Sequence, residues 1–193
     1  MIYDSAGPWS KIALSVAVSA CPALLFAVFL AFGLSHNVSI IEPGLAYRSG
    51  QLWPNELVAV VEDYHIRSII SLVPPEPGQD WYREARKVAA VRGLTRYEMP
   101  LSSRQELTPK QLVQLVALLR SAPKPVLIQS NKGADRGGLA AALFEYAVAS
   151  RSVEEAYKQL SLRYGHLPAF WNGTEAMDIS YKRFVATAAS VEP

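Results

Sequence analysis

The stretch that decides the fold reads VLIQSNKGADRGGLAAAL and runs from Val126 to Leu143. Its first residues are aliphatic and predict a short buried strand that ends at Gln129. The apolar segment from about Arg136 to Ala149 predicts a helix, and a loop containing Gly133 joins the two. In open α/β sheets, ligands bind beyond the carboxyl ends of the strands. The order of strand, loop and helix therefore predicts a binding loop at Ser130–Asp135.

The expected loop has the features of an anion site. A helix start offers unpaired N–H groups and the positive end of a dipole, and a tight glycine-bearing loop turns further N–H groups inward. Arg136 adds a planar guanidinium that suits two phosphate oxygens, and a cation at a helix start is unfavourable without an anion. The loop is not a Walker loop, because GxxxxGK[ST] is absent. The predicted phosphate-binding residues are Asn131, Lys132, Gly133, Ala134, Asp135, Arg136 and Gly137.

Composition excludes several other classes of protein. The chain has 193 residues with 19 Lys and Arg against 17 Asp and Glu, so the net charge of +2 gives no reason to expect nucleic-acid binding. Half of the residues are hydrophobic, which excludes wholesale disorder. The single cysteine, Cys21, cannot form an intramolecular disulfide. The histidines at 36, 65 and 166 share no ligand spacing, so we expect no metal and no cofactor.

An apolar segment near the N-terminus predicts a membrane anchor. From Ile12 to Ser35 there is no charged side chain, and a helix of this length would span roughly 36 Å, enough for the hydrocarbon core. A cleaved signal peptide remains an alternative, although its apolar region is typically only about 7–15 residues long. Lys11 before the segment favours a cytoplasmic N-terminus and a domain on the non-cytoplasmic side. We expect a tail at 1–11, a single-pass anchor at 12–35, a linker at 36–44 and a domain at 45–190.

The rest of the chain alternates strand-like and helix-like segments. Strands are predicted at 45–49, 66–73 and 94–101, in addition to the one that ends at Gln129. Helices are predicted at 54–64, at 80–92, from Thr108 to Pro123, from Ser152 onward, and at 175–186. This alternation predicts an α/β fold, a three-layer sandwich whose mostly parallel central sheet of four to five strands is flanked by helices.

The loop from Ser130 to Arg136 resembles the signature of the protein tyrosine phosphatase superfamily, H-C-x5-R-[ST], because five residues separate the two positions. It is most similar to small bacterial dual-specificity-like phosphatases, whose loops commonly read like HCKAGADRTGLA. Four further segments resemble the same group: Tyr47–Gln51, Asp80–Glu84, Pro100–Arg104 and Leu160–His166. The resemblance covers residues 44–186. It implies a phosphatase-like fold, a phosphorylated protein or small phosphomonoester as ligand and, in an active member, phosphomonoester hydrolysis without metal.

Three positions depart from the family pattern. Ser130 stands where the family has its nucleophilic cysteine, Gln129 replaces the preceding histidine, and Gly137 replaces the hydroxyl residue after the arginine. A serine hydroxyl is far less acidic than a thiol, and serine nucleophiles need an adjacent base. An engineered substrate trap would keep the flanking histidine and hydroxyl. The joint loss therefore favours a natural pseudophosphatase that binds phosphate with little or no turnover.

The resemblance implies catalytic positions at Ser130, Asp135 and Arg136. The general acid of the family usually lies on a separate loop, but the corresponding segment Glu98–Glu106 contains no Asp. Some relatives carry an acid just before the arginine, so Asp135 is a candidate, and capping of the following helix is an equal alternative. We expect a capping or buried structural role for His166. Two alternatives stay open for the whole protein: an active phosphatase whose cysteine was replaced, and an interaction module that leaves the loop idle.

Overall fold

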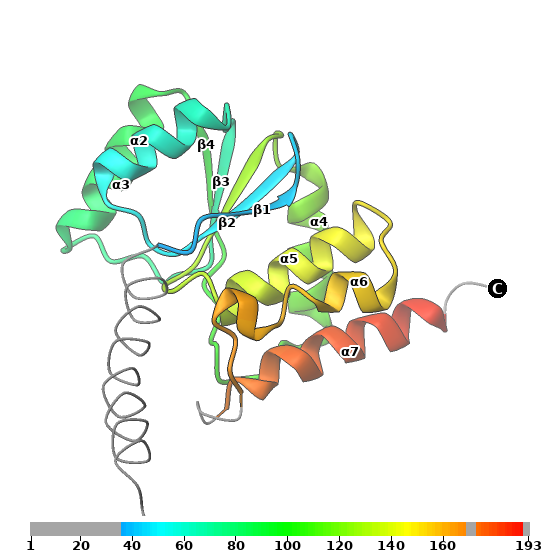
Figure 1. Ribbon diagram of the computed structural model, residues 1–193. Helices are drawn as coiled ribbons and strands as arrows, with labels where there is room; N and C mark the ends of the chain where they lie inside the picture. Colours follow the sequence, from blue (N-terminus) through cyan, green and yellow to red (C-terminus); the bar gives the residue numbers. More distant parts are fainter. Residues whose placement is uncertain (1–35, 169–172, 191–193) are drawn as a thin grey trace, which may run out of the picture. The chain divides into compact units, whose positions relative to one another are not determined.

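The computed structural model describes residues 36–168 and 173–190, which form a sheet with helices on both faces (Figure 1). The strand order is β1-β2-β5-β3-β4. Neighbouring strands are parallel except for β1, which pairs antiparallel with β2. This five-stranded, mostly parallel sheet confirms the predicted α/β class.

The elements follow the predicted alternation along the chain. The strands are β1 (Ser39–Glu42), β2 (Ala46–Ser49), β3 (Ser68–Ser71), β4 (Thr95–Glu98) and β5 (Val126–Gln129). The helices are α2 (Pro54–Asp63), α3 (Asp80–Val91), α4 (Pro109–Ser121), α5 (Asp135–Ala147), α6 (Val153–Tyr157) and α7 (Glu175–Ala189), with the 3-10 helix η1 (Leu162–Tyr164).

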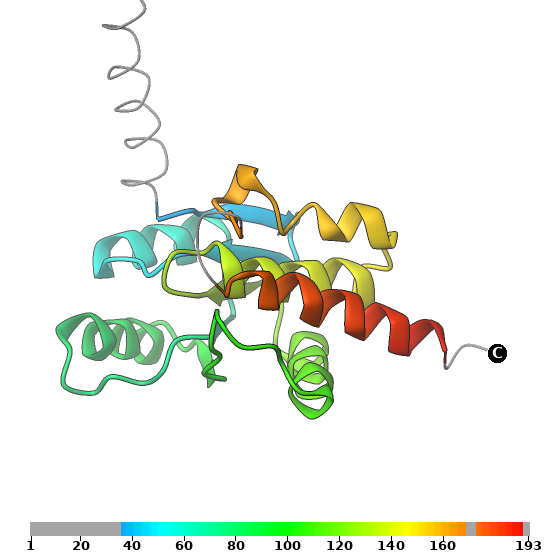
Figure 2. The ribbon, with the colours of Figure 1, turned by 90° about the horizontal axis from the view of Figure 1, so that it is seen from below.

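The central strands bury both of their faces against different helices. Ile69 and Leu127 belong to the core cluster formed with α2 and α3. Their neighbours Ile70 and Ile128 belong to the cluster formed with α4, α5, α6 and α7. Successive side chains of a strand point to opposite faces, so each strand contributes to both clusters. Figure 2 shows the two helix layers on opposite sides of the sheet.

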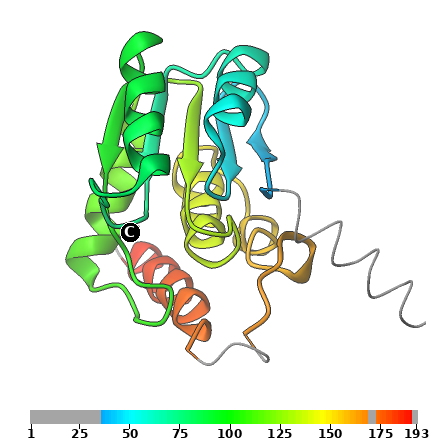
Figure 3. The same cartoon turned by 90° about the vertical axis from the view of Figure 1, so that its left-hand side faces the viewer.

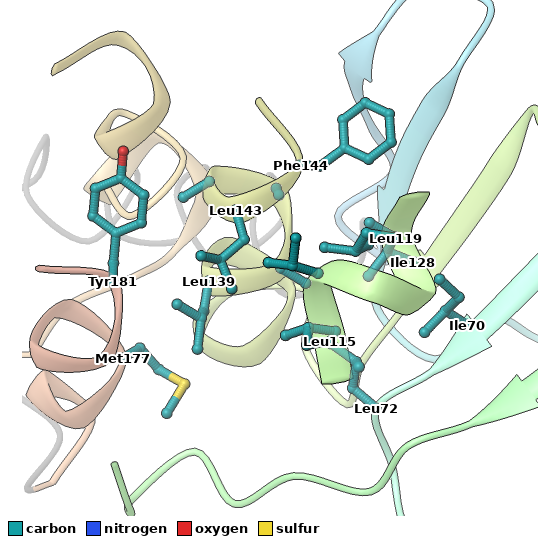
Figure 4. Packing of buried hydrophobic residues seen from close by; sticks show 14 of the residues in the cluster. Ile70, Leu72, Leu115, Leu119, Ile128, Leu139, Leu143, Phe144, Met177 and Tyr181 are labelled. Atoms are coloured by element: carbon teal, nitrogen blue, oxygen red, sulfur yellow. The ribbon is translucent and has the colours of Figure 1, made fainter. Parts of the chain in front are cut away.

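Helix α5 lies at the centre of the larger cluster. Every residue from Gly137 to Phe144 is buried, as expected of a helix that is apolar all round. In Figure 4, Leu139 and Leu143 of α5 lie between Leu115 of α4 and Met177 of α7. The helix that follows the predicted binding loop is therefore fixed by packing on several sides.

The linker expected at 36–44 is corrected by the structure, because it contains the edge strand β1. Ile41 is buried, whereas Ile40 is 48% exposed. Four residues with only two apolar side chains give too weak a pattern to distinguish such a strand from a connection. The strands β3 and β4 are also shorter than predicted, because flanking apolar residues such as Ile66 and Leu101 are buried beyond the paired residues.

The predicted anchor at 12–35 lies outside the described residues. Across 36–168 and 173–190, none of the helices combines the length and the apolar character needed to cross a bilayer.

Candidate functional site

The predicted binding loop lies at the carboxyl end of β5, the strand that pairs with β2 on one side and with β3 on the other. Residues 130–134 follow the strand, and α5 begins at Asp135. The amide of Ser130 donates to Ser49 O at 3.1 Å, which continues the pairing of β5 with β2 by one residue. Figure 3 shows the parallel strands running the same way, with the yellow-green loop beyond the end of β5. This is the edge at which α/β sheets bind their ligands.

The loop curls around the side chain of Ser130. Ser130 is 2% exposed, and its Oγ accepts a hydrogen bond from the amide of Gly133 at 3.2 Å. Gly133 has a φ of +69°, and a Cβ there would lie 2.7 Å from Gly50 N. Only glycine meets both the left-handed backbone and the close approach to the end of β2.

A buried arginine, Arg48 of β2, holds the loop from inside the protein. Its side chain is fully buried, and it donates from Nε to Gly133 O at 3.1 Å and from Nη2 to Ala134 O at 2.9 Å. Its Nη1 donates to Gln159 O and Oε1. Carbonyl and N–H point in opposite directions across a trans peptide. The amides of Ala134 and Asp135 therefore face away from Arg48.

Arg48 places a positive charge beneath the loop. Burial lowers the pKa of Arg48 to about 10, which leaves the guanidinium protonated at neutral pH. No carboxylate of the described residues forms an ion pair with it. Gln159 links Arg48 to an acid, because its Nε2 donates to Glu145 Oε1 at 2.6 Å. The Arg48 guanidinium also stacks over the ring of Tyr164 at 4.5 Å. An anion above the loop would lie in an attractive field.

Arg136 is oriented by the loops that follow the neighbouring strands. Its Nη1 donates to Leu72 O at 3.1 Å and to Leu101 O at 3.0 Å, just beyond β3 and β4. Partial burial lowers the pKa of Arg136, and the charge of Asp135 partly offsets that effect. Its Nε and Nη2 make no hydrogen bond to the described residues. The guanidinium is thus fixed by one nitrogen, and the other two suit two oxygens of a phosphate.

Asp135 belongs to a partly buried chain of hydrogen bonds rather than to a helix cap. Its Oδ1 pairs with His166 Nδ1 at 2.8 Å, and His166 Nε2 pairs with Asp178 Oδ2 at 2.8 Å. Tyr157 donates its hydroxyl to Asp178 Oδ1 at 2.6 Å. The N-cap of α5 is Ala134, and no side chain caps that helix. Helix capping, one of the two alternatives for Asp135, is therefore not observed.

His166 is charged at neutral pH in this chain of bonds. Burial disfavours the imidazolium, but the bonds to Asp135 and Asp178 outweigh it and raise the pKa of His166 to about 9. Burial would likewise raise the pKa of Asp178, but the bonds from His166 and Tyr157 lower it. The Oδ1 atom of Asp135 is engaged in this bond with His166 Nδ1. This arrangement favours a structural role for Asp135 over proton donation to a leaving group.

The remaining predicted residues lie in the same loop and at the first turn of α5. Asn131 and Lys132 are exposed, and their carbonyls accept from Gln51 N and from Asn37 Nδ2. Gly137 faces the serine, since a Cβ there would lie 3.2 Å from Ser130 Oγ. A hydroxyl residue at position 137 would stand beside Ser130, and glycine supplies none.

Several residues of this region were not predicted as site residues. Arg48 carried one signal, because it interrupts an otherwise uncharged strand. Asn37 gave no signal within the expected linker. The pairing of His166 with Asp178 depends on the tertiary contact between the segment after η1 and α7, which no local pattern predicts.

Comparisons with known proteins identify the fold. No family model matches the sequence, and no curated protein matches it. Among solved structures, TpbA of P. aeruginosa superposes with a TM-score of 0.60 at 16% identity, covering 76% of this chain and 84% of TpbA. A TpbA variant in complex with phosphotyrosine gives a TM-score of 0.56 at 17% identity, covering 76% of this chain and 83% of the variant.

A eukaryotic enzyme gives a similar match. The core catalytic domain of the PP-IP phosphatase Siw14 of S. cerevisiae gives a TM-score of 0.60 at 19% identity, covering 81% of this chain and 95% of that domain. Likeness at such identities establishes the fold. The domain described here therefore has the fold of tyrosine-phosphatase-like phosphatases.

Proposed function

We propose that this protein binds the phosphate group of a phosphorylated ligand in the loop Ser130–Gly137 and is anchored in a membrane by residues 12–35. The observation that carries the proposal is that two arginines, Arg48 and Arg136, contact main-chain carbonyls in and around the loop. Arg48 donates to the carbonyls of Gly133 and Ala134 from the interior of the protein. The amides of Ala134 and Asp135 therefore face away from Arg48. Arg136 Nη1 donates to two main-chain carbonyls, Leu72 O and Leu101 O, which orient the guanidinium. Both arrangements suit a tetrahedral anion.

Turnover by this loop is expected to be absent or very weak. Ser130 Oγ accepts from Gly133 N, and no hydrogen bond from this hydroxyl to an acceptor is found among the described residues. A serine nucleophile needs a base that takes its proton. The nearby Asp135 and His166 are bonded to each other, and loss of a nucleophile costs several orders of magnitude in rate.

The structural relatives support a phosphomonoester as the ligand. The TpbA variant was crystallised with phosphotyrosine, and Siw14 is described as a PP-IP phosphatase. Both are proteins that handle phosphate groups on the same fold. For this chain the shared chemistry is a phosphate group presented to the loop between β5 and α5.

Titration with inorganic phosphate or tungstate tests the proposal. A ligand present at about 100 times its Kd raises the free energy of unfolding by about 2.7 kcal/mol, so the melting temperature of the parent protein should rise. Arg136→Ala should abolish that rise, whereas Arg92→Ala, which alters an exposed ion pair with Glu62, should preserve it. A parent protein that shows no rise would support the idle interaction module instead.

A phosphatase assay separates a natural pseudophosphatase from an enzyme with a replaced cysteine. Ser130→Cys alone should recover little turnover, because Gln129 and Gly137 still lack the flanking groups. Strong activity in that variant would show that a single replacement had silenced a working enzyme.

Extraction of membranes with alkaline carbonate tests the anchor. The full-length chain should stay with the membranes. A shortened chain in the soluble fraction would support a cleaved signal peptide.

A further inference from the structure

The outer edge of strand β4 carries main-chain groups that no neighbouring strand uses. In the described part of the chain β4 is the last strand of the sheet order and pairs with β3 alone, and Figure 3 shows it at the left-hand margin of the sheet. The amides of Thr95 and Met99 donate to carbonyls at or next to the ends of β3. Because alternate residues of a strand face the same way, Arg96 and Glu98 turn their amides and carbonyls to the open side. An added strand can bond to these groups.

The side chains of Arg96 and Glu98 are also incompletely paired. Arg96 Nε lies 3.4 Å from Glu98 Oε1, which accepts from the Tyr82 hydroxyl as well, at 2.7 Å. The Arg96 side chain is only 8% exposed, and its Nη1 and Nη2 are buried with no acceptor among residues 36–168 and 173–190. Arg86, the other cation at Tyr82, is itself a donor and supplies no acceptor. Buried donors without an acceptor are costly and rare, so the structure lacks a partner for Arg96.

The order of charges along β4 suits a second copy of the same strand. The strand reads Thr-Arg-Tyr-Glu, with opposite charges on either side of Tyr97. Antiparallel pairing about a twofold axis at Tyr97 places Arg96 directly opposite the partner's Glu98. Both of these residues turn their main-chain groups outward, so the same register forms the main-chain hydrogen bonds. An axis at Arg96 or at Glu98 would instead place like charges opposite each other, which is destabilising.

We propose that this protein forms a homodimer in which two copies of β4 pair antiparallel about Tyr97, so that the sheet continues from one subunit into the next. The partner's Glu98 supplies the acceptor that Arg96 Nη1 and Nη2 lack, and the twofold symmetry repeats the contact on the other side of the axis. The axis is perpendicular to the sheet, which keeps helix α3 of both subunits on the same side of it. Dimer formation does not require an occupied phosphate loop.

The competing explanation is that the charges of β4 keep its edge unpaired. Edge strands are often protected from pairing by charged side chains. On β4, however, the cation and the anion lie on opposite sides of Tyr97, so the register centred on Tyr97 brings no like charges together. A monomeric parent protein would favour protection of the edge and would overturn the proposal.

Reversal of single charges tests this register. The full-length chain is purified in a mild detergent, and its association is measured by analytical ultracentrifugation. Arg96→Glu and Glu98→Arg should each weaken the dimer at least about tenfold, because the dimer contains each contact twice and 1.4 kcal/mol corresponds to tenfold. An equimolar mixture of the two variants should recover the affinity of the parent, since opposite charges then meet across the axis. Both variants have lost the ion pair within their own chain, so recovery on mixing must come from contacts between chains.

An ion pair at the other edge of the sheet provides the matched control. Arg151 Nη2 lies 2.9 Å from Glu42 Oε2 of β1. Arg151→Glu and Glu42→Arg, alone or mixed, should associate like the parent. Association through the apolar segment 12–35 would be insensitive to all of these changes. A dimer of equal strength in every variant would therefore overturn the proposal.

A disulfide across the axis gives a second measurement that leaves the charges of β4 unchanged. Tyr97→Cys, made together with Cys21→Ser, places one thiol in each chain at the position that the register brings against itself. Opposite residues of this kind in antiparallel strands have Cα atoms about 4.5 Å apart, which is within the range of disulfides. Mild oxidation of the full-length variant should therefore yield a covalent dimer.

Thr95→Cys in the same background is the control for random collision. Thr95 is more exposed than Tyr97, but in this register it lies opposite the partner's Met99. Chains with Tyr97→Cys should cross-link at least about tenfold faster than chains with Thr95→Cys, because pairing raises the effective concentration of the two thiols. Equal rates, or faster cross-linking through position 95, would contradict the proposed pairing of β4.

Discussion

Arg48 Nε lies 3.1 Å from Gly133 O in the buried interior beneath the binding loop. The contact joins the carboxyl end of β2 to the loop after β5, which lies far along the chain. A guanidinium in such a place is costly unless its donors are satisfied, and here main-chain carbonyls and Gln159 satisfy them. The structure of the loop and the solvation of this charge therefore depend on each other.

Replacing that guanidinium should damage stability and binding together. Arg48→Met keeps much of the side-chain volume but removes the buried donors to Gly133 O, while Ala134 O keeps the amide of Gly138. We expect a loss of about 3 kcal/mol or more in the free energy of unfolding, measured by urea denaturation. The stabilisation by phosphate should vanish at the same time.

Arg92→Met, at an exposed ion pair, should stay within about 0.5 kcal/mol of the parent. A stable Arg48→Met protein that still binds phosphate would contradict the assigned role.

Two glycines, Gly133 and Gly93, allow two costs of substitution to be separated: the cost of a left-handed backbone and the cost of a Cβ that clashes with neighbouring backbone atoms. Gly133 and Gly93 both have positive φ, +69° and +66°, but only Gly133 would bring a Cβ against backbone atoms. Gly93→Ala should cost about 1–2 kcal/mol through the left-handed conformation alone. Gly133→Ala should cost at least about 2 kcal/mol more, since atoms of Ser49 and Gly50 must move. Equal losses in chemical denaturation would show that the loop relaxes freely.

Much of the fold was predictable because its signals are local. The helix α4 illustrates this: Thr108 accepts from Gln111 N at 3.3 Å, and Pro109 occupies the first turn, as the capping pattern predicts. The buried run at β5 was equally clear, because a strand buried on both faces is continuously apolar. The edge strand β1 lacked such a signal, since one of its two isoleucines faces solvent.

The candidate site was predictable only where its residues are consecutive. The loop Ser130–Gly137 could be predicted from one motif, because strand, glycine and helix start follow each other directly. Arg48, Asn37 and His166 come from three distant segments, and their approach depends on sheet order and packing. Asp135 shows the limit most clearly. Its position beside Arg136 at a helix start left a general acid and a helix cap equally open, and neither alternative predicted the bond to His166, 31 residues along the chain.

We predict that the buried pair of His166 and Asp178 makes the free energy of unfolding decline at alkaline pH. The pKa of His166 is raised to about 9 in the folded protein, above the ordinary value of about 6.5 for the unfolded chain. Its contribution is therefore complete below about pH 6.5 and is lost as the pH rises through about 9. We expect the free energy of unfolding to decline over this window in the parent. His166→Gln should be less stable at pH 7 and should show a shallower decline.

The measurement of unfolding free energy against pH needs an upper pH limit and a control variant. Burial and the bond to Asp178 raise the pKa of Tyr157 to about 12, so tyrosine ionisation adds a further loss above about pH 10. Denaturation curves should therefore end near pH 9.5. His65→Asn changes an exposed histidine and should keep the slope of the parent. The same slope in the parent and in His166→Gln would mean that His166 is not the group that titrates.

A thiol placed at the base of the loop measures the field that the two arginines and the helix start create. Ser130→Cys, made together with Cys21→Ser, carries its sulfur where Ser130 Oγ accepts from Gly133 N. A free thiol has a pKa near 8.5, and a helix N-terminus and nearby cations lower it. We expect an apparent pKa at least about one unit below that value, measured by the pH dependence of alkylation with iodoacetamide.

Ser121→Cys in the same background is the control, because Ser121 is exposed in the last turn of α4, the negative end of the dipole. Arg136→Ala added to the loop variant should return the pKa part of the way towards 8.5. An unshifted thiol at position 130 would show that the loop does not favour an anion, and the phosphate-binding proposal would lose its electrostatic basis.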